Sequence, residues 1–208
     1  MAIRNIFCVG RNYADHATEL GDTVPGEPMI FSKPTNALVH ADDRTVRYPE
    51  NQGAVHHELE VVLYVGKDVL SDDFAVDDVV SKMALGVDMT LRDVQEELKQ
   101  EGKPWLLAKG FKNAAVVTEF WDFPGEAACR EAYFKLTRDG EVVQTGNIND
   151  MIFSFHDIMT YIQAHFGLRE GDIIYTGTPE GVGPVSDGET YELWWGDTLQ
   201  GQFGVSMA

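Results

Sequence analysis

Short strand-like runs, separated by turn residues, constrain the fold of this 208-residue chain more than any other feature of its sequence. Two strand-like segments meet at Arg138-Asp139-Gly140-Glu141, and Asp-Gly between two such segments indicates a β-hairpin. Because the runs do not alternate regularly with helices, a Rossmann-type sheet is disfavoured and we expect a mixed α/β, β-dominated fold. The runs are Phe7–Val9, Met29–Ser32, Glu58–Val65, Lys135–Arg138, Ile173–Tyr175, Tyr191–Trp195 and Phe203–Ser206.

Helices are expected to be fewer than strands. Two of them begin at a Ser or Thr followed three residues later by Asp, the pattern of a helix N-cap, and end at a Gly. Residues 1–208 contain no internal repeat, low-complexity tract or linker-like change in composition, so we expect a single domain. The expected helices run from Thr90 to Glu101, before Gly102; from Ser154 to the residue before Gly167; and from Val76 to Met83.

The chain is strongly acidic, with 16 Lys and Arg against 34 Asp and Glu and a formal net charge of −18 at pH 7. Such a surface repels nucleic-acid phosphates and anionic lipid head groups, which excludes a general nucleic-acid-binding protein and a peripheral membrane protein. No apolar stretch approaches the roughly 18 residues of a membrane span, and no signal peptide is recognisable. Cys8 and Cys129 are interpreted as two free thiols, so we expect a cytoplasmic protein.

Two glutamates on one strand are the first sign of a metal site. Glu58 and Glu60 point to the same face of their strand, roughly 6.5–7 Å apart, and two carboxylates this close repel unless a cation or a proton intervenes. Mg²⁺ or Mn²⁺ suits such oxygen ligands, and Asp88, at the end of another apolar run, is available as a third carboxylate. An ordinary solvated strand face is the alternative. Zinc is disfavoured because the adjacent His56 and His57 would point to opposite faces.

Other candidate functional groups are weaker when each is taken alone. His16 and Glu19 are three residues apart, so on a helical turn the carboxylate would orient the imidazole as a base; a solvated polar turn is the alternative. Lys33 and Lys109 lie among apolar or small residues, where a lysine either binds an oxyanion or extends its ammonium group to water. The Gly-rich segment 176–184 either binds an anion through backbone N–H groups or forms a plain turn.

These segments belong to a set of motifs spread along nearly the whole chain. The motifs are Gly-Arg-Asn-Tyr-x-x-His-x-x-Glu at 10–19, Phe-x-Lys-Pro at 31–34, His-x-Glu-x-Glu at 56–60, Asp-x-Thr-x-Arg-Asp-x-Gln at 88–95, Lys-Gly-Phe at 109–111, Met-Ile-Phe at 151–153 and Thr-Gly-Thr-Pro-x-Gly-Val-Gly at 176–183. In order and spacing they resemble the fumarylacetoacetate hydrolase family. Larger members of the family carry an extra N-terminal domain, and the first motif begins too early in this chain to leave room for one. In this respect the chain resembles the short subgroup of acylpyruvases, oxaloacetate decarboxylases and oxaloacetate tautomerases. The resemblance implies a mixed β-sandwich roll and a homodimer.

The resemblance also implies a role for each candidate residue. A divalent cation, Mg²⁺ or Mn²⁺, would act as a Lewis acid on a small anionic 2-oxo acid and stabilise the enolate formed when a bond to C3 breaks. A general base would activate water, and a lysine would stabilise the developing oxyanion. In this chain the implied metal ligands are Glu58, Glu60 and Asp88, the base is His16 oriented by Glu19, the lysine is Lys109, and the substrate contacts are Arg11, Lys33, Gln95 and Thr178.

The function that the resemblance implies is a Mg²⁺- or Mn²⁺-dependent hydrolase that cleaves C–C bonds of acylpyruvates and also decarboxylates oxaloacetate. Oxaloacetate keto–enol tautomerase is the nearest alternative, because the same enolate can be protonated instead; an isomerase or decarboxylase of aromatic catabolism is another. A metal-containing 2-oxo acid binding protein is disfavoured because it needs no acid–base pair such as His16 and Glu19. The net charge of −18 does not exclude an anionic substrate if the metal, with Arg11, Lys33 and Lys109, reverses the sign locally.

Overall fold

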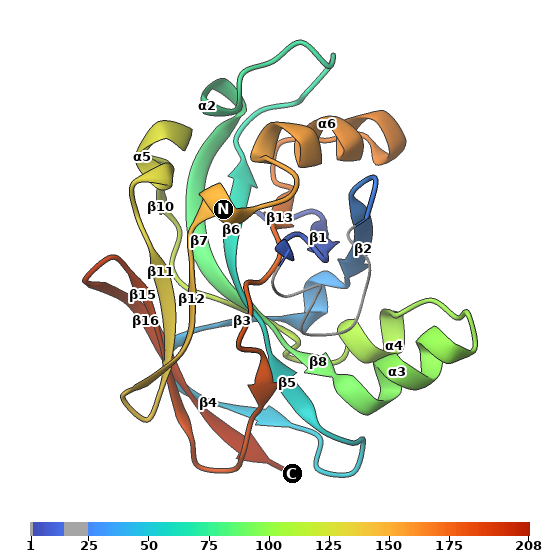
Figure 1. The fold of residues 1–208 in the computed structure, drawn as a ribbon, viewed down its shortest axis with the longest axis vertical. Helices are drawn as coiled ribbons and strands as arrows, with labels where there is room; N and C mark the ends of the chain where they lie inside the picture. The colour runs from blue at the N-terminus through green and yellow to red at the C-terminus, as the bar shows by residue number, and fades with distance from the viewer. Residues whose placement is uncertain (1, 15–24) are drawn as a thin grey trace.

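Residues 2–14 and 25–208 are described by a computed structural model in which strands dominate (Figure 1). The described strands form a large sheet of eight strands, a second sheet of five and a small sheet of three. The large sheet has the order β2-β1-β13-β6-β7-β9-β3, and β10 pairs with β7. Its strands are β1 (Ile6–Gly10), β2 (Met29–Lys33), β3 (Leu38–His40), β6 (Leu59–Val65), β7 (Val80–Asp88), β9 (Ala115–Val117), β10 (Trp121–Asp122) and β13 (Ile173–Tyr175).

Strands β6 and β7 form the middle of the large sheet, where Figure 1 shows β7 as a long curved strand beside β6. Every residue of β6 is buried, so both of its faces are covered, which explains its continuous apolar sequence. The helix expected from Val76 to Met83 is wrong beyond Val79. Helix α2 covers only Val76–Val79, and the chain then pairs with β6 on one side and, at Lys82 and Met83, with β10 on the other. These two ladders outweigh the local helical pattern.

The second sheet has the order β12-β11-β15-β16-β4 and packs against the large one. Its β11–β12 hairpin turns at Asp139 and Gly140, both with positive φ, as the Asp-Gly signal predicts. The ring of Trp195 lies 6.1 Å from Trp121 of the large sheet and 6.4 Å from Phe134, centroid to centroid. The strands are β4 (Asp42–Tyr48), β11 (Phe134–Arg138), β12 (Glu141–Gly146), β15 (Thr190–Trp195) and β16 (Thr198–Met207).

Short helices and a small sheet border the two large sheets. Helix α6 begins with the expected capping box of Ser154 and Asp157 and ends at Gly167, and Phe166 stacks on Phe7 of β1. The helices are α2, α3 (Arg92–Gln100), α4 (Leu106–Lys109), α5 (Glu126–Arg130) and α6 (Phe155–Phe166), with single 3₁₀ turns η1 (Thr35–Ala37) and η2 (Ile148–Asp150); the small sheet joins β5 (Val55–His57), β8 (Thr90–Leu91) and β14 (Gly183–Pro184).

The start of α3 differs from the expected cap. The residue that precedes the helix is Leu91, and no side chain caps it. Thr90 belongs to β8, where it pairs with His56, and its hydroxyl bonds to Glu58. Asp93 accepts a hydrogen bond from the backbone N–H of Ala54 at 2.8 Å instead of closing a capping box. Tertiary partners thus replace the local cap that the sequence pattern indicates.

The expected fold class is confirmed, since the described residues form a mixed α/β, strand-rich structure and every strand-like run named above contains a strand. Cys8 and Cys129 are both buried free thiols, as expected. Among the described helices, none combines the length and the apolar character that crossing a bilayer requires.

Candidate metal centre

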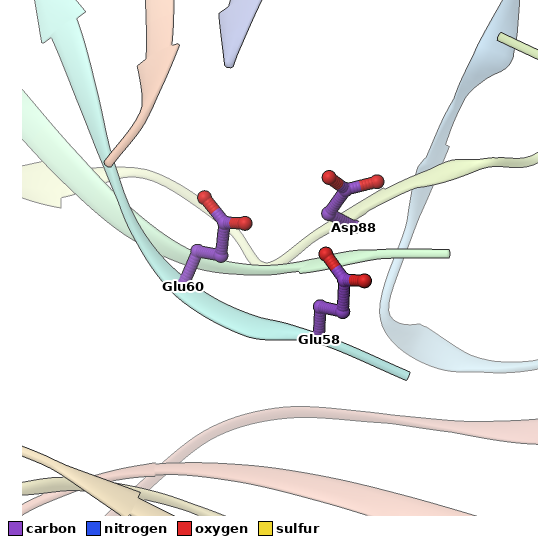
Figure 2. A group of neighbouring side chains, drawn as sticks. All are labelled: Glu58, Glu60 and Asp88. Atoms are coloured by element: carbon purple, nitrogen blue, oxygen red, sulfur yellow. The ribbon is translucent and has the colours of Figure 1, made fainter. Parts of the chain in front are cut away.

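Three carboxylates meet at the junction of β6 and β7. Glu58 lies just before β6, Glu60 lies within β6, and Asp88 ends β7. One oxygen from each lies within 4.8 Å of the others, and Figure 2 shows the three carboxylates gathered on the same side of the two strands. Their exposed fractions are 5%, 1% and 0%. A solvated strand face is therefore excluded.

The antiparallel pairing of β6 and β7 brings these residues together from distant parts of the sequence. The register places Glu60 opposite Gly86, and the backbone N–H of Asp88 donates to the carbonyl of Glu58 at 2.8 Å. Glu60 is also held from a second side, because the backbone N–H of Gly177 donates to its Oε2 at 2.7 Å. Gly177 has φ of +103°, and a Cβ there would lie 2.6 Å from the Cβ of Asn12, so this approach requires glycine.

The electrostatics of the cluster favour a cation. Burial raises the pKa of Glu60, and the neighbouring carboxylates of Asp88 and Glu58 raise it further. Buried carboxylates at this spacing are costly unless protons or cations neutralise them. An all-oxygen set of carboxylates is the donor chemistry of Mg²⁺ and Mn²⁺, so the residues present fit the cation that the sequence predicts.

Two buried lysines face the same carboxylates. The Nζ of Lys109 donates to Glu58 Oε2 at 2.7 Å, to Asp88 Oδ2 at 2.9 Å and to Thr90 Oγ1 at 2.6 Å. Burial alone would lower the pKa of Lys109, but the carboxylates of Asp88 and Glu58 outweigh it, so its pKa is raised and the ammonium form is favoured. The Nζ of Lys33 lies 2.5 Å from Asp88 Oδ1. Both lysines are at most 3% exposed, so neither extends to water.

Arg92, at the start of α3, is a site residue that the sequence reasoning missed. Its Nη2 donates to Glu58 Oε1 at 2.5 Å, and its Nη1 donates to Gln95 Oε1 at 2.6 Å. The guanidinium group thereby joins a carboxylate of the cluster to the predicted substrate contact Gln95. A signal was present in the sequence, because Arg92 and Gln95 are three residues apart on a helix and so lie on one face.

A cleft opens beside the carboxylates. Of the predicted substrate contacts, Arg11, Gln95 and Thr178 line it, whereas Lys33 is absent from the lining and faces Asp88. Arg11 has φ of 59°, so the chain turns sharply where it leaves β1 and enters the cleft. The cleft is lined by Val9, Gly10, Arg11, Met29, Phe31, Glu58, Glu60, Arg92, Gln95, Lys99, Trp105, Lys109 and Thr178.

The side chain of Asn12 holds three motifs that are distant in sequence close together in space. Its buried amide Nδ2 donates to the carbonyl oxygens of Thr176 at 2.8 Å and Phe153 at 3.1 Å, and its Oδ1 accepts from the N–H of Phe153 at 2.8 Å. This single side chain connects the first motif to the Met-Ile-Phe and Thr-Gly-Thr-Pro motifs. The Gly-rich segment that begins at Thr176 is thus fixed against the cleft rather than a free turn.

The predicted base His16 and its partner Glu19 lie outside the described residues. Their roles therefore stay predictions from the sequence. Of the described candidates, the three carboxylates and the two lysines converge, and Arg11, Gln95 and Thr178 line the cleft beside them.

Comparisons with known proteins agree with this geometry. Residues 5–204 match the family model described as fumarylacetoacetate (FAA) hydrolase C-terminal. The chain is 42% identical over 210 residues to a mitochondrial oxaloacetate tautomerase of Mus musculus, covering 99% of this chain and 93% of that protein. It is 37% identical over 187 residues to a mitochondrial oxaloacetate decarboxylase of Dictyostelium discoideum, with coverage of 89% and 86%. The fold matches fumarylpyruvate hydrolase from Pseudomonas aeruginosa, crystallised with Mn²⁺ and pyruvate, with a TM-score of 0.89, 33% identity and coverage of 99% and 91%.

Proposed function

Because the chain belongs to the fumarylacetoacetate hydrolase family, we propose that it is a Mg²⁺- or Mn²⁺-dependent enzyme acting on small 2-oxo acids, with oxaloacetate keto–enol tautomerisation as its leading reaction. The observation that carries the proposal is the convergence of Glu58, Glu60 and Asp88 beside the ammonium group of Lys109. The relatives named as an oxaloacetate tautomerase and an oxaloacetate decarboxylase support the substrate class.

The side chains of the cleft give it a sign opposite to that of the whole chain. Arg11, Arg92, Lys99 and Lys109 line it together with only two carboxylates, those of Glu58 and Glu60. These cations favour binding of a dianion such as oxaloacetate, even though the formal net charge of the chain is −18. The acidic surface therefore does not prevent binding of an anionic substrate.

The residues around the cluster have distinct chemical tasks. The divalent cation, when held by Glu58, Glu60 and Asp88, would supply Lewis-acid stabilisation of negative charge on the 2-oxo acid. Lys109 donates through Nζ and its raised pKa keeps it cationic, so we assign it to stabilising negative charge on an enolate oxygen. Arg92, fixed between Glu58 and Gln95, orients the substrate carboxylate.

A substrate comparison tests this proposal. Purified protein, treated with chelator and then given Mg²⁺, is offered oxaloacetate prepared as the enol, oxaloacetate as the keto form, and acetylpyruvate. We expect enol–keto conversion above the rate of Mg²⁺ alone, and its loss after addition of EDTA. Failure to turn over any of these compounds in a metal-dependent way would reject the enzymatic function and leave a 2-oxo acid binding protein.

Hydrolysis of acylpyruvates is the second candidate, supported by the fold match to fumarylpyruvate hydrolase. This reaction needs a base that activates water, and His16 with Glu19 is the predicted pair. The two candidates differ in their products, since hydrolysis of acetylpyruvate yields acetate and pyruvate whereas tautomerisation leaves the carbon skeleton intact. Product analysis by NMR in the same substrate comparison separates them.

A further inference from the structure

Gln144, on β12 of the second sheet, is 1% exposed and contacts the segment that carries Glu58 and Glu60. Its Oε1 accepts from the backbone N–H of Leu59 at 2.9 Å and faces Nδ1 of His57 at 3.0 Å. Its Nε2 donates to Thr178 Oγ1 at 2.8 Å and to the carbonyl of Pro179 at 3.0 Å. The amide therefore uses its full hydrogen-bonding capacity, two bonds accepted and two donated.

The two backbone partners determine which way this amide points. The N–H of Leu59 can only donate, so the atom facing it must be the amide oxygen. The carbonyl of Pro179 can only accept, so the atom facing it must be the amide nitrogen. Because both constraints agree, the orientation of the Gln144 amide follows from the backbone alone. It also follows that His57 carries a proton on Nδ1.

The orientation of Gln144 has a consequence for Thr178. Since Nε2 of Gln144 donates to Thr178 Oγ1, that hydroxyl oxygen acts as acceptor towards Gln144. The hydroxyl proton of Thr178 must then point elsewhere. The carbonyl of Pro179 is a poor partner, because it lies 3.4 Å from Oγ1, well beyond the usual O–H···O distance. Thr178 lines the cleft, so its proton is directed at whatever anion occupies the cleft.

We propose that Gln144 is a positioning residue that makes the Thr178 hydroxyl a hydrogen-bond donor to an anionic oxygen of the bound 2-oxo acid. The ligand class rests on the proposed function, whereas the direction of the hydrogen bond rests on the four contacts of Gln144. The same amide connects the loop of Thr178 to Leu59, which lies between Glu58 and Glu60, so the donor is placed relative to the carboxylates.

The variant Gln144→Glu reverses the direction of the hydrogen bond between residue 144 and Thr178 without changing the shape of the side chain. One carboxylate oxygen still accepts from the N–H of Leu59, but the other cannot donate, so the Thr178 hydroxyl turns to donate to it and presents lone pairs to the cleft. We expect the Kd of the Mn²⁺-loaded protein for oxalate and for pyruvate, measured by calorimetry, to rise about 10- to 100-fold, the value of a hydrogen bond to a charged group. The Kd for Mn²⁺ itself should change less than threefold.

Gln163→Glu is the matched control, because Gln163 on α6 also accepts a backbone N–H, that of Leu168 at 2.7 Å, and does not line the cleft. It should leave both dissociation constants unchanged. Gln144→Met, which carries no charge, should raise the Kd for oxalate by a smaller factor, because the hydroxyl is released rather than reversed. Should Gln144→Glu fail to fold, Gln144→Met alone decides: an unchanged Kd for oxalate would reject the proposal.

A double-mutant cycle separates positioning of Thr178 from a structural role of Gln144. Thr178→Val removes the hydroxyl, so adding Gln144→Glu to it should weaken oxalate binding less than twofold further. An equal loss in both backgrounds would overturn the proposal, as would a wild-type protein that binds neither probe when loaded with Mn²⁺. If oxalate binding follows the cycle but the wild type turns over no 2-oxo acid, the proposed function fails and the role of Gln144 stands.

Discussion

The Nζ of Lys109 lies 2.7 Å from Oε2 of Glu58, so an ammonium group contacts the cluster of three buried carboxylates directly, bonding to Glu58 and Asp88. Lys109 comes from α4 and Glu58 from the start of β6, and both are almost completely shielded from water. A divalent cation bound by the same carboxylates has to share them with this ammonium group. The lysine is thus close enough to act on a substrate bound at the metal, and its substitution should affect chemistry more than metal binding.

We expect Lys109→Met to lower turnover of oxaloacetate about 10²- to 10³-fold, as is typical for loss of a donor that stabilises developing negative charge. Binding of Mn²⁺ should be retained or tightened, because a competing cation is removed. Steady-state kinetics and calorimetry on the same sample measure both effects. Lys112→Met, at an exposed lysine of the same region, is the control and should change neither. Loss of Mn²⁺ binding in Lys109→Met would contradict this account.

Glu60→Gln should weaken Mn²⁺ binding by on the order of 100-fold or more, since even groups that only support a ligand contribute 10- to 100-fold. The amide keeps the volume of the carboxylate but lacks its charge. Calorimetric titration with Mn²⁺ measures the effect. Glu119→Gln, at a carboxylate whose side chain is 87% exposed, is the matched control and should bind Mn²⁺ as wild type does. An unchanged affinity in Glu60→Gln would show that the ligand assignment is wrong.

His16→Ala should abolish hydrolysis of acetylpyruvate and spare oxaloacetate tautomerisation, because only the first reaction needs an activated water molecule. Product formation by NMR follows both reactions. His156→Ala, at an exposed position on α6, is the control. Equal loss of both reactions in His16→Ala would mean that they depend on one base.

A substitution at Gly86 tests the strand packing that brings the carboxylates together. A Cβ at this position would lie 2.5 Å from the ring of Tyr175 and 2.8 Å from the backbone oxygen of Val116. Since Gly86 pairs with Glu60 in the sheet, we expect Gly86→Ala to destabilise the protein by about 2 kcal/mol, as overpacked sites do. Urea denaturation measures this loss. Gly26→Ala, at a position where a Cβ meets nothing within 4 Å, should cost far less. Equal stabilities would argue against the described register.

The two thiols should be inert in the folded protein. Burial raises the pKa of Cys129 to about 12 and raises the pKa of Cys8 as well. At pH 8 the reactive thiolate is therefore scarcer than in an unfolded chain, where the pKa is about 8.5. Mass spectrometry after iodoacetamide treatment should find neither cysteine alkylated until denaturant is added. Equal alkylation rates with and without denaturant would contradict the burial of both residues.

The fold class and seven of the sixteen described strands could be predicted from the sequence, because period-two and continuous apolar runs are local signals. Strand β7 could not, since its first residues, Val80 to Met83, read as the end of a helix and become a strand only through pairing with β6 and β10. The helix N-cap predicted at Thr90 was wrong for a related reason. The hydroxyl of Thr90 bonds to Glu58, which is 32 residues away in sequence. Local patterns do not carry such contacts.

The candidate site likewise contains residues that could be predicted from the sequence and residues that could not. Glu58, Glu60 and Asp88 could be found because carboxylates in apolar runs are unusual, and the structure brings them together. Gln144 could not be found, because its importance comes from four contacts with segments of the chain that are distant in sequence. The roles of His16 and Glu19, and the homodimer implied by the family resemblance, stay predictions that the described residues do not test.

In the function that we propose, turnover of a 2-oxo acid requires a divalent cation held by Glu58, Glu60 and Asp88. Its most direct test is a Mg²⁺ titration of chelator-treated protein while the enol-to-keto conversion of oxaloacetate is followed by ultraviolet absorbance. We predict a rate that rises from that of the buffer to a plateau far above that of Mg²⁺ alone. A rate that is independent of Mg²⁺, or that never exceeds the rate of Mg²⁺ without protein, would contradict the account.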